Sequence, residues 1–157
     1  MRFVVDGMLG KTARFLRMLG NDVKYFSTLK DRQLIEIAKR EHRFLLTRDL
    51  ELYQRAVMQG TNAFLVEGKT EAERLAGLAK QFGISLEIDV TNSRCPKCNA
   101  KIKPIEKKEV IGKVPKTTLS SYDEFWECSR CGQIYWRGAH WKRIKRTLKE
   151  AEMLSRR

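Results

Sequence analysis

Residues 2–26 of the chain, RFVVDGMLGKTARFLRMLGNDVKYF, decide the fold class. The apolar run at residues 3–5 predicts a buried strand that ends at Asp6. Residues 8–19 then carry apolar side chains at helical spacing, and Gly20 with Asn21 ends that pattern before a second strand at residues 23–26. A strand, a helix and another strand in so short a stretch predict a parallel β-α-β unit.

The same alternation continues as far as residue 82. Buried-type strands are expected at residues 43–47 and 62–66. Amphipathic helices are expected over residues 31–40, 49–58 and 70–82. The connections are short, so residues 1–91 are predicted to form an α/β domain with a mostly parallel sheet flanked by helices.

Acidic residues follow the predicted strands. Asp6 comes directly after the first strand, Asp49 follows the third, and Asp31 lies in the loop after the second. Glu51 lies two residues beyond Asp49 and can reach the same edge. Carboxylates that converge on the carboxyl ends of strands repel one another unless a cation lies between them, and Mg²⁺ and Mn²⁺ prefer such oxygen ligands. We therefore predict a shared metal site, with helix N-caps as the alternative role of Asp31 and Asp49.

The string GMLGKT at residues 7–12 follows a strand and opens a helix, as a phosphate-binding loop does. A P-loop needs a further glycine five residues before Gly10, and Val5 stands there. The loop is thus too short to wrap a nucleotide phosphate, which argues against nucleotide hydrolysis.

All four cysteines form two C-x-x-C pairs, at Cys95 with Cys98 and at Cys128 with Cys131. Two such pairs can hold one Zn²⁺ with four thiolates, which leaves no open position for catalysis. An iron–sulfur cluster would accept the same ligands, and two disulfides are disfavoured in a reducing compartment. We predict a structural zinc ribbon, with strands at residues 109–115 and 125–127, that needs the metal to fold.

The basic charge lies mostly in the second half. The chain has a formal net charge of +13; residues 1–91 hold 15 Lys and Arg against 12 Asp and Glu, and residues 92–157 hold 17 against 7. An excess of this size indicates an anionic partner, and nucleic acid is the commonest one. Aromatic and cationic side chains alternate after the second cysteine pair, a pattern that suits stacked bases and phosphates of single-stranded RNA. The candidate RNA contacts there are Trp136, Arg137, His140, Lys142 and Arg143, followed by a basic helix over residues 141–154.

Two of these features also have plainer interpretations. Trp136 and its neighbour Tyr135 could simply cover the small zinc core, and a single His such as His140 is more often a structural hydrogen-bonding group. No apolar run is long enough to cross a membrane, and the mixed charges of the N-terminus do not fit a signal peptide. We expect a cytoplasmic protein.

Taken together, these strings resemble the Mut-seven C-terminal RNase domain family, in which a PIN-like nuclease domain precedes a Cys₄ zinc ribbon. The matching stretches cover nearly the whole chain: FVVDGMLGK at residues 3–11, ARFLR at 13–17, LLTRD at 45–49, RCPKCN at 94–99, FWEC at 125–128 and CGQIYWRGAH at 131–140, with Asp31, Leu34 and Ala38 between them.

The resemblance implies a Mg²⁺- or Mn²⁺-dependent single-strand endoribonuclease that acts in RNA processing or decay. It places Asp6, Asp31 and Asp49 on one catalytic metal site, and Glu51 occupies the place of an acid found in related PIN-like proteins. Arg14 or Arg48 could stabilise negative charge on the phosphate. The implied domains are residues 1–91 and residues 92–157, the latter a zinc ribbon with a basic C-terminal helix that assists RNA binding beside the cutting site.

Two other functions remain open at this point. One is a non-catalytic RNA-binding adaptor with an idle acidic edge, and the other is a ribbon that contacts proteins in a ribosomal or transcription assembly. Whether the protein forms a homodimer or joins a ribonucleoprotein partner is not fixed by the sequence.

Overall fold

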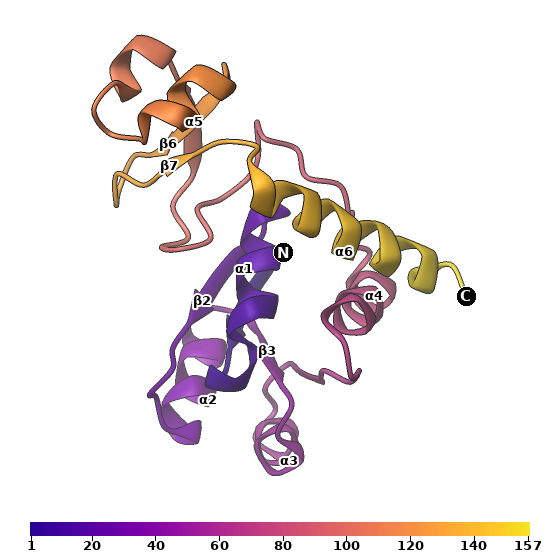
Figure 1. Cartoon of the computed structure of the whole chain (residues 1–157). Helices are drawn as coiled ribbons and strands as arrows, with labels where there is room; N and C mark the ends of the chain where they lie inside the picture. Colours follow the sequence, from indigo (N-terminus) through magenta and orange to yellow (C-terminus); the bar gives the residue numbers. More distant parts are fainter.

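The computed structural model describes all 157 residues, and its larger part is built on a four-stranded parallel sheet (Figure 1). The strands are β1 (Arg2–Val5), β2 (Asp22–Tyr25), β3 (Phe44–Thr47) and β4 (Ala63–Leu65), in the order β2-β1-β3-β4. The chain moves from β1 to β2 on one side and reaches β3 on the other, so the strand order reverses between β1 and β3. Parallel sheets of this kind bind ligands at the carboxyl ends of the strands at that reversal.

Helices cover both faces of the sheet, as the alternation in the sequence predicted. Helices α1 (Gly10–Met18), α4 (Glu71–Phe82) and α6 (Ala139–Ser155) pack with Phe3 and Leu46 on one face. Helices α2 (Asp31–Arg40) and α3 (Leu50–Met58) pack with Val4 and Leu45 on the other. Neighbouring residues of β1 and β3 thus point into two separate cores, because side chains alternate along a strand. The predicted α/β class is confirmed.

The ribbon is a three-stranded antiparallel sheet of β5 (Ile102–Ile105), β6 (Phe125–Cys128) and β7 (Ile134–Tyr135). The prediction of a strand at residues 109–115 is wrong, because that region begins in the short helix η2 (Lys107–Val110) and continues as a turn. Val110 is fully buried against Phe125 and Ile134, so its apolar character serves a small core rather than a strand. A second short helix, α5 (Lys116–Ser121), precedes β6.

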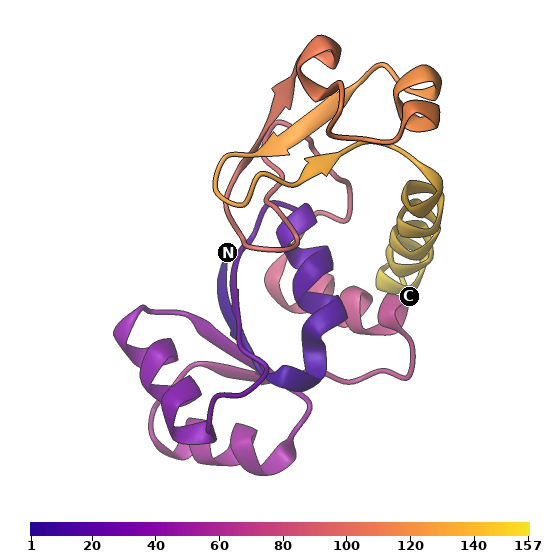
Figure 2. The ribbon, with the colours of Figure 1, turned by 60° about the vertical axis from the view of Figure 1, so that its left-hand side comes forward.

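The ribbon docks at the amino ends of the sheet strands, where α1 finishes (Figure 2). Arg17, at the end of α1, is buried and donates to the carbonyls of Val23 and Pro96 at 2.8 and 2.9 Å. Asn99 follows the first cysteine pair with φ +75°, accepts from the Val23 amide at 2.9 Å and donates to Asp22 at 2.8 Å. Asp6 lies before α1 begins, so the ribbon and the acidic residue occupy opposite ends of that helix. The ribbon is therefore not beside the acidic edge, contrary to the expectation from the sequence.

The last helix, α6, begins at Ala139 rather than at residue 141 and returns to the larger core. Its Leu148 and Ala151 are buried in the same cluster as Phe3, Leu16 and Leu75. By packing, α6 thus belongs with the parallel sheet, although the ribbon precedes it in the chain. None of the helices combines the length and the apolar character that a membrane crossing demands.

Candidate active site and zinc site

Asp6 and Asp49 lie at the carboxyl ends of adjacent strands and are joined through Thr47. Asp6 accepts the Met8 amide at 3.0 Å through Oδ1 and the Thr47 hydroxyl through Oδ2. The Thr47 Oγ1 in turn accepts the Asp49 amide at 2.9 Å. Thr47 is fully buried and Asp6 nearly so, which fixes the orientation of the Asp6 carboxylate. The two acids that the sequence placed on a common edge are brought together there.

The electrostatics of Asp6 favour a nearby cation. Burial raises the pKa of its carboxyl, the hydrogen bonds from Thr47 and Met8 lower it, and the charges of Asp49 and Asp31 raise it further. The net effect is a raised pKa. A positive ion would offset both the burial and the repulsion among the carboxylates, since an opposite charge favours the ionised form.

A helix N-cap was the alternative role for Asp31 and Asp49, and only Asp49 has it, because Lys30 is the N-cap of α2. Asp49 is the N-cap of α3, and its Oδ1 accepts the amides of Glu51 and Leu52. Asp31 is the first residue of α2, and its Oδ2 lies 3.3 Å from a guanidinium nitrogen of Arg55 in α3. Glu51, in the first turn of α3, is exposed and its carboxylate has no partner. A capping role does not remove a carboxylate from metal binding, because Asp49 keeps its second oxygen free.

Two further acids at this edge were missed by sequence reasoning. Glu71, at the start of α4, is almost buried and accepts the Thr12 hydroxyl of α1 at 2.6 Å. Glu67 follows β4 two residues after the strand ends, as an exposed side chain. Glu67 carried a usable signal, its place after a strand, whereas Glu71 read as an ordinary first-turn acid of a helix.

The donor set fits a hydrated hard cation. Every candidate ligand atom at this edge is a carboxylate oxygen. The acids do not, however, form a set of three or more whose oxygens all lie within 4.8 Å of one another. Mg²⁺ usually keeps several of its waters and uses one or two carboxylates directly. An open group centred on Asp6 and Asp49 is compatible with that habit.

The four cysteines do form a closed set, because the Sγ atoms of Cys95, Cys98, Cys128 and Cys131 all lie within 4.8 Å of one another. The cross pairs Cys95 with Cys131 and Cys98 with Cys128 are 3.7 and 3.3 Å apart, and all four thiols are free. Four sulfurs at such spacing surround a centre suited to a tetrahedral ion with Zn–S bonds of about 2.3 Å. The residues therefore fit Zn²⁺, as the two C-x-x-C pairs predicted.

The protein environment of these sulfurs is also that of a metal site. Burial opposes charge on Cys128, yet backbone amides of Cys131 and Arg130 outweigh it and lower the pKa to about 7. Burial raises the pKa of Cys95 to about 12, although the Tyr135 hydroxyl and two amides favour its thiolate. The Tyr135 oxygen lies 3.0 Å from the Cys95 sulfur. A divalent cation would hold Cys95 as a thiolate. The hydrogen bond of Tyr135 to the Cys95 sulfur was not evident from the sequence.

The candidate RNA-binding residues fall into two separate places. Arg14 is exposed on α1, whereas Arg48 donates to the carbonyls of Val66 and Gly68 at 3.2 and 2.9 Å and so holds the loop after β4. The other candidates lie where the ribbon joins α6: Trp136, Arg137, His140, Lys142 and Arg143.

Contacts at this junction restrain several of those side chains. Trp136 is half-buried and packs against Phe125, with ring centroids 6.3 Å apart. His140 Nδ1 lies 2.8 Å from a guanidinium nitrogen of Arg143, and both residues are exposed. Trp136 thus serves the small ribbon core while the cationic groups remain open to solvent.

A family model, the Mut7-C RNAse domain, matches residues 1–148. The chain belongs to the Mut7-C RNAse domain family. None of the curated proteins and none of the solved structures compared with the chain matches it. The Mut7-C match covers the acidic edge, the cysteine set and most of α6, so one ribonuclease-type domain includes all the features described above.

Proposed function

We propose that this protein is a metal-dependent endoribonuclease that cuts single-stranded RNA at the carboxyl ends of β1 and β3, in RNA processing or decay. The observation that carries this proposal is the Asp6–Thr47–Asp49 connection at the strand-order reversal of a Mut7-C RNAse domain. The reducing cytoplasm is the proposed compartment, because the four cysteines are free thiols suited to zinc.

Asp6, Asp31 and Asp49 would hold Mg²⁺ or Mn²⁺, with Glu51 as a further ligand. Such an ion, when bound, lowers the pKa of a coordinated water and stabilises negative charge at a phosphodiester. Thr47 keeps the Asp6 carboxylate in one orientation through its hydroxyl. Arg14, exposed on the adjacent helix, supplies positive charge for a phosphate, and Arg48 acts by holding the β4–α4 loop. Attack in line would leave 5′-phosphate and 3′-hydroxyl ends.

Zinc at Cys95, Cys98, Cys128 and Cys131 is proposed as structural only, since four thiolates leave no position for substrate. The ribbon and the start of α6 would bind RNA at a distance from the cutting site. RNA is the proposed partner, and a homodimer or a ribonucleoprotein partner stays a question for measurement of mass in solution.

Cleavage assays on structured and unstructured RNA with Mn²⁺ or Mg²⁺ test this proposal. Wild type should cut the unstructured RNA, and Asp6→Asn and Asp49→Asn should abolish cutting while RNA binding persists. Asp123→Asn, on a ribbon side chain that is 93% exposed, is the matched control and should cut normally. Equal cutting by all four proteins would reject the catalytic assignment and point to a contaminant.

A non-catalytic RNA-binding adaptor is the second candidate. The ion pair of Asp31 with Arg55 and the spread of the acids favour it. Tight RNA binding by the wild type with no cleavage under either metal would select this function.

A further inference from the structure

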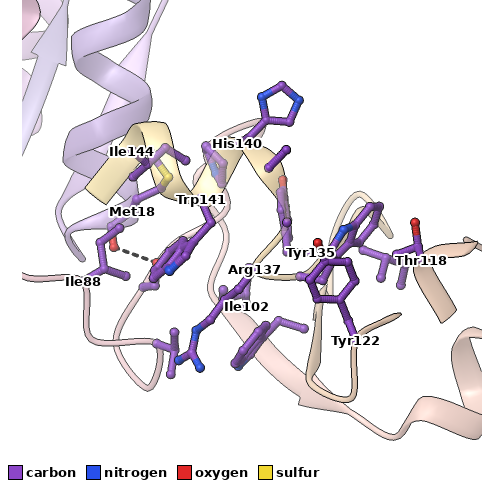
Figure 3. A pocket seen from close by; sticks show the side chains of 18 of the residues that line it. Met18, Ile88, Ile102, Thr118, Tyr122, Tyr135, Arg137, His140, Trp141 and Ile144 are labelled. Atoms are coloured by element: carbon purple, nitrogen blue, oxygen red, sulfur yellow. Dashed lines mark hydrogen bonds between the residues drawn. The ribbon is translucent and has the colours of Figure 1, made fainter. Parts of the chain in front are cut away.

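A cavity of about 550 Å³ opens where the ribbon meets α1 and α6 (Figure 3). All three tryptophans of the chain line it: Trp126 from β6, Trp136 after β7 and Trp141 in α6. Met18 at the end of α1 and Ile88 in the segment between α4 and β5 complete an apolar wall, and Figure 3 shows the Trp141 ring on this side of the cavity. Mostly apolar cavities of this size with a few polar groups are typical of small-molecule or cofactor-sized ligands.

The charge of the cavity indicates an anionic occupant. No Asp or Glu lines it, whereas Arg94, Arg137 and His140 do. The Arg137 guanidinium carbon lies 5.1 Å from the Trp126 ring centroid and 5.6 Å from that of Trp141, so it forms part of an aromatic and cationic wall. Glu124, outside the cavity, pairs with Arg137 at 2.7 Å and keeps it in place.

Exposed cationic side chains of α1 lie between this cavity and the acidic edge. Lys11, Arg14 and Met18 are spaced i, i+3 and i+7 along α1, so they lie on one face of that helix. Lys11 and Arg14 are exposed, and Met18 belongs to the cavity wall. The helix starts near Asp6 and has nine residues, which spans about 13 Å. An RNA strand that lies along this face would place its phosphates near the Lys11 and Arg14 side chains, between the cavity and the acidic edge.

We propose that the cavity receives an unpaired nucleobase of an RNA strand whose backbone follows Lys11 and Arg14 to the acidic edge. Stacking on indole rings accepts any base, and the surrounding cations match the phosphates. The part concerning the cut rests on the proposed nuclease function. The protein would then measure the position of the cut, because cleavage would occur at a constant number of nucleotides from the bound base. We call this measuring role the ruler.

Base binding can be measured without cleavage, using full-length zinc-loaded Asp6→Asn without Mg²⁺ or Mn²⁺. Single-stranded oligoribonucleotides should quench tryptophan emission, because every tryptophan lines the cavity. Trp141→Ala should weaken binding about tenfold, within the range for stacking of one base, and Trp141→Phe should retain most of the affinity. Met153→Ala, a 59% exposed residue at the far end of α6, is the matched control and should bind normally.

Unchanged affinity and quenching in Trp141→Ala would overturn the proposal and leave the cavity to a protein partner. If Trp141→Ala loses affinity and also has a lowered melting temperature, the loss reflects the fold. In that case Trp141→Phe, which keeps the fold, decides the question. Normal affinity of Trp141→Phe together with loss of affinity for an RNA carrying one abasic nucleotide supports base insertion. Equal affinity for all singly abasic RNAs contradicts it.

The ruler is tested with the same singly abasic RNAs and the wild-type enzyme. The abasic position that weakens binding should lie at a constant offset from the cut. Base-sensitive binding with no cleavage would reject the nuclease function and keep the cavity assignment. Cleavage at sites indifferent to every abasic position would reject the cavity assignment and keep the nuclease.

Discussion

At the scale of single residues, Thr47 is the group on which the geometry of the acidic edge depends. Its hydroxyl donates to Asp6 and accepts the Asp49 amide, so one side chain connects two strand ends. A threonine in a strand carries no signal of such a role, because β-branched residues are ordinary there. The sequence indicated the two acids and could not indicate what orients them.

Thr47→Val should show what the orientation of the Asp6 carboxylate contributes, because this variant keeps every carboxylate that would bind the metal. Valine keeps the shape but leaves the partly buried Asp49 amide without its acceptor, which should lower the free energy of unfolding by about 1 kcal/mol. Losing a partner that orients a ligand should cost about 10- to 100-fold in metal affinity or cleavage rate. Thr47→Ser retains the hydroxyl and is the control in urea unfolding and in cleavage assays. Equal activity of the valine and serine variants would contradict the role given to Thr47.

Asp22 gives a stability prediction that depends on pH. Partial burial opposes its charge, but hydrogen bonds from Arg43 and Asn99 hold its pKa at about 2. Because the pKa is depressed by folding, the stabilisation is complete above pH 4–5, the region of the unfolded carboxyl, and disappears as pH falls through 2. Wild type should therefore exceed Asp22→Asn in free energy of unfolding by about 2 kcal/mol near pH 6.

Denaturant unfolding at several pH values checks this prediction. The difference between wild type and Asp22→Asn should narrow steadily from pH 5 downward. A difference that is the same at pH 6 and pH 3 would mean that the Asp22 carboxylate contributes nothing through its charge.

At the scale of elements, local patterns predicted the parallel sheet well and the ribbon poorly. Each helix of the larger part buries a regular stripe, such as Leu34, Ile35 and Ala38 in α2, so its pattern is visible along the chain. In β5, by contrast, the exposed Lys103 and Pro104 lie next to each other between two half-buried isoleucines, so the strand shows no alternation in the sequence. Elements held by a metal need little apolar periodicity, and their positions therefore leave a weak trace in the sequence.

The docking of the ribbon was also beyond sequence reasoning. It depends on Arg17 and Asn99, two polar residues far apart in the chain that meet only in the fold. The adjacency of Asp6 and Asp49 was predictable because parallel strands end at one edge. The location of the basic residues relative to that edge could not be predicted in this way.

Removal of zinc should unfold the ribbon and spare the parallel sheet. The cores around Phe3 and Val4 contain no residue of β5, β6 or β7, whereas the cysteine core consists of three of the proposed zinc ligands and their neighbours. Elemental analysis should find one zinc per chain, and a strong chelator should remove hydrogen-exchange protection from β6 but not from β1 or β3. Cys128→Ser should behave like the chelated protein and Ser129→Ala like the wild type. Persisting protection of β6 without metal would show that the ribbon folds alone.

At the scale of the whole molecule, acids and bases are separated along α1. The acidic edge lies at the start of that helix, and the ribbon with its excess of bases lies at its end. A substrate that uses both must extend across the face between them. Affinity and catalysis are thus assigned to different ends of one protein.

This separation predicts different responses to salt. If about six phosphates of a single strand are neutralised, RNA affinity should fall about 300-fold between 50 and 200 mM salt. The Mn²⁺ concentration that gives half-maximal cleavage at saturating RNA should change little, because the proposed ligands of that ion are carboxylates away from the basic surface. Fluorescence anisotropy and cleavage measured over the same salt series give both quantities. Salt-independent RNA affinity would contradict electrostatic binding by the ribbon and α6.

The packing of α6 in the larger core has a consequence for folding during synthesis on the ribosome. Ribosomes add residues from the N-terminus, so the strand that contains Phe3 is made before Leu148 and Ala151, which pack in the same core. The entire ribbon emerges in between. The core beside the acidic edge therefore closes only after the ribbon has been synthesised, and the four cysteines leave the ribosome before that core is complete.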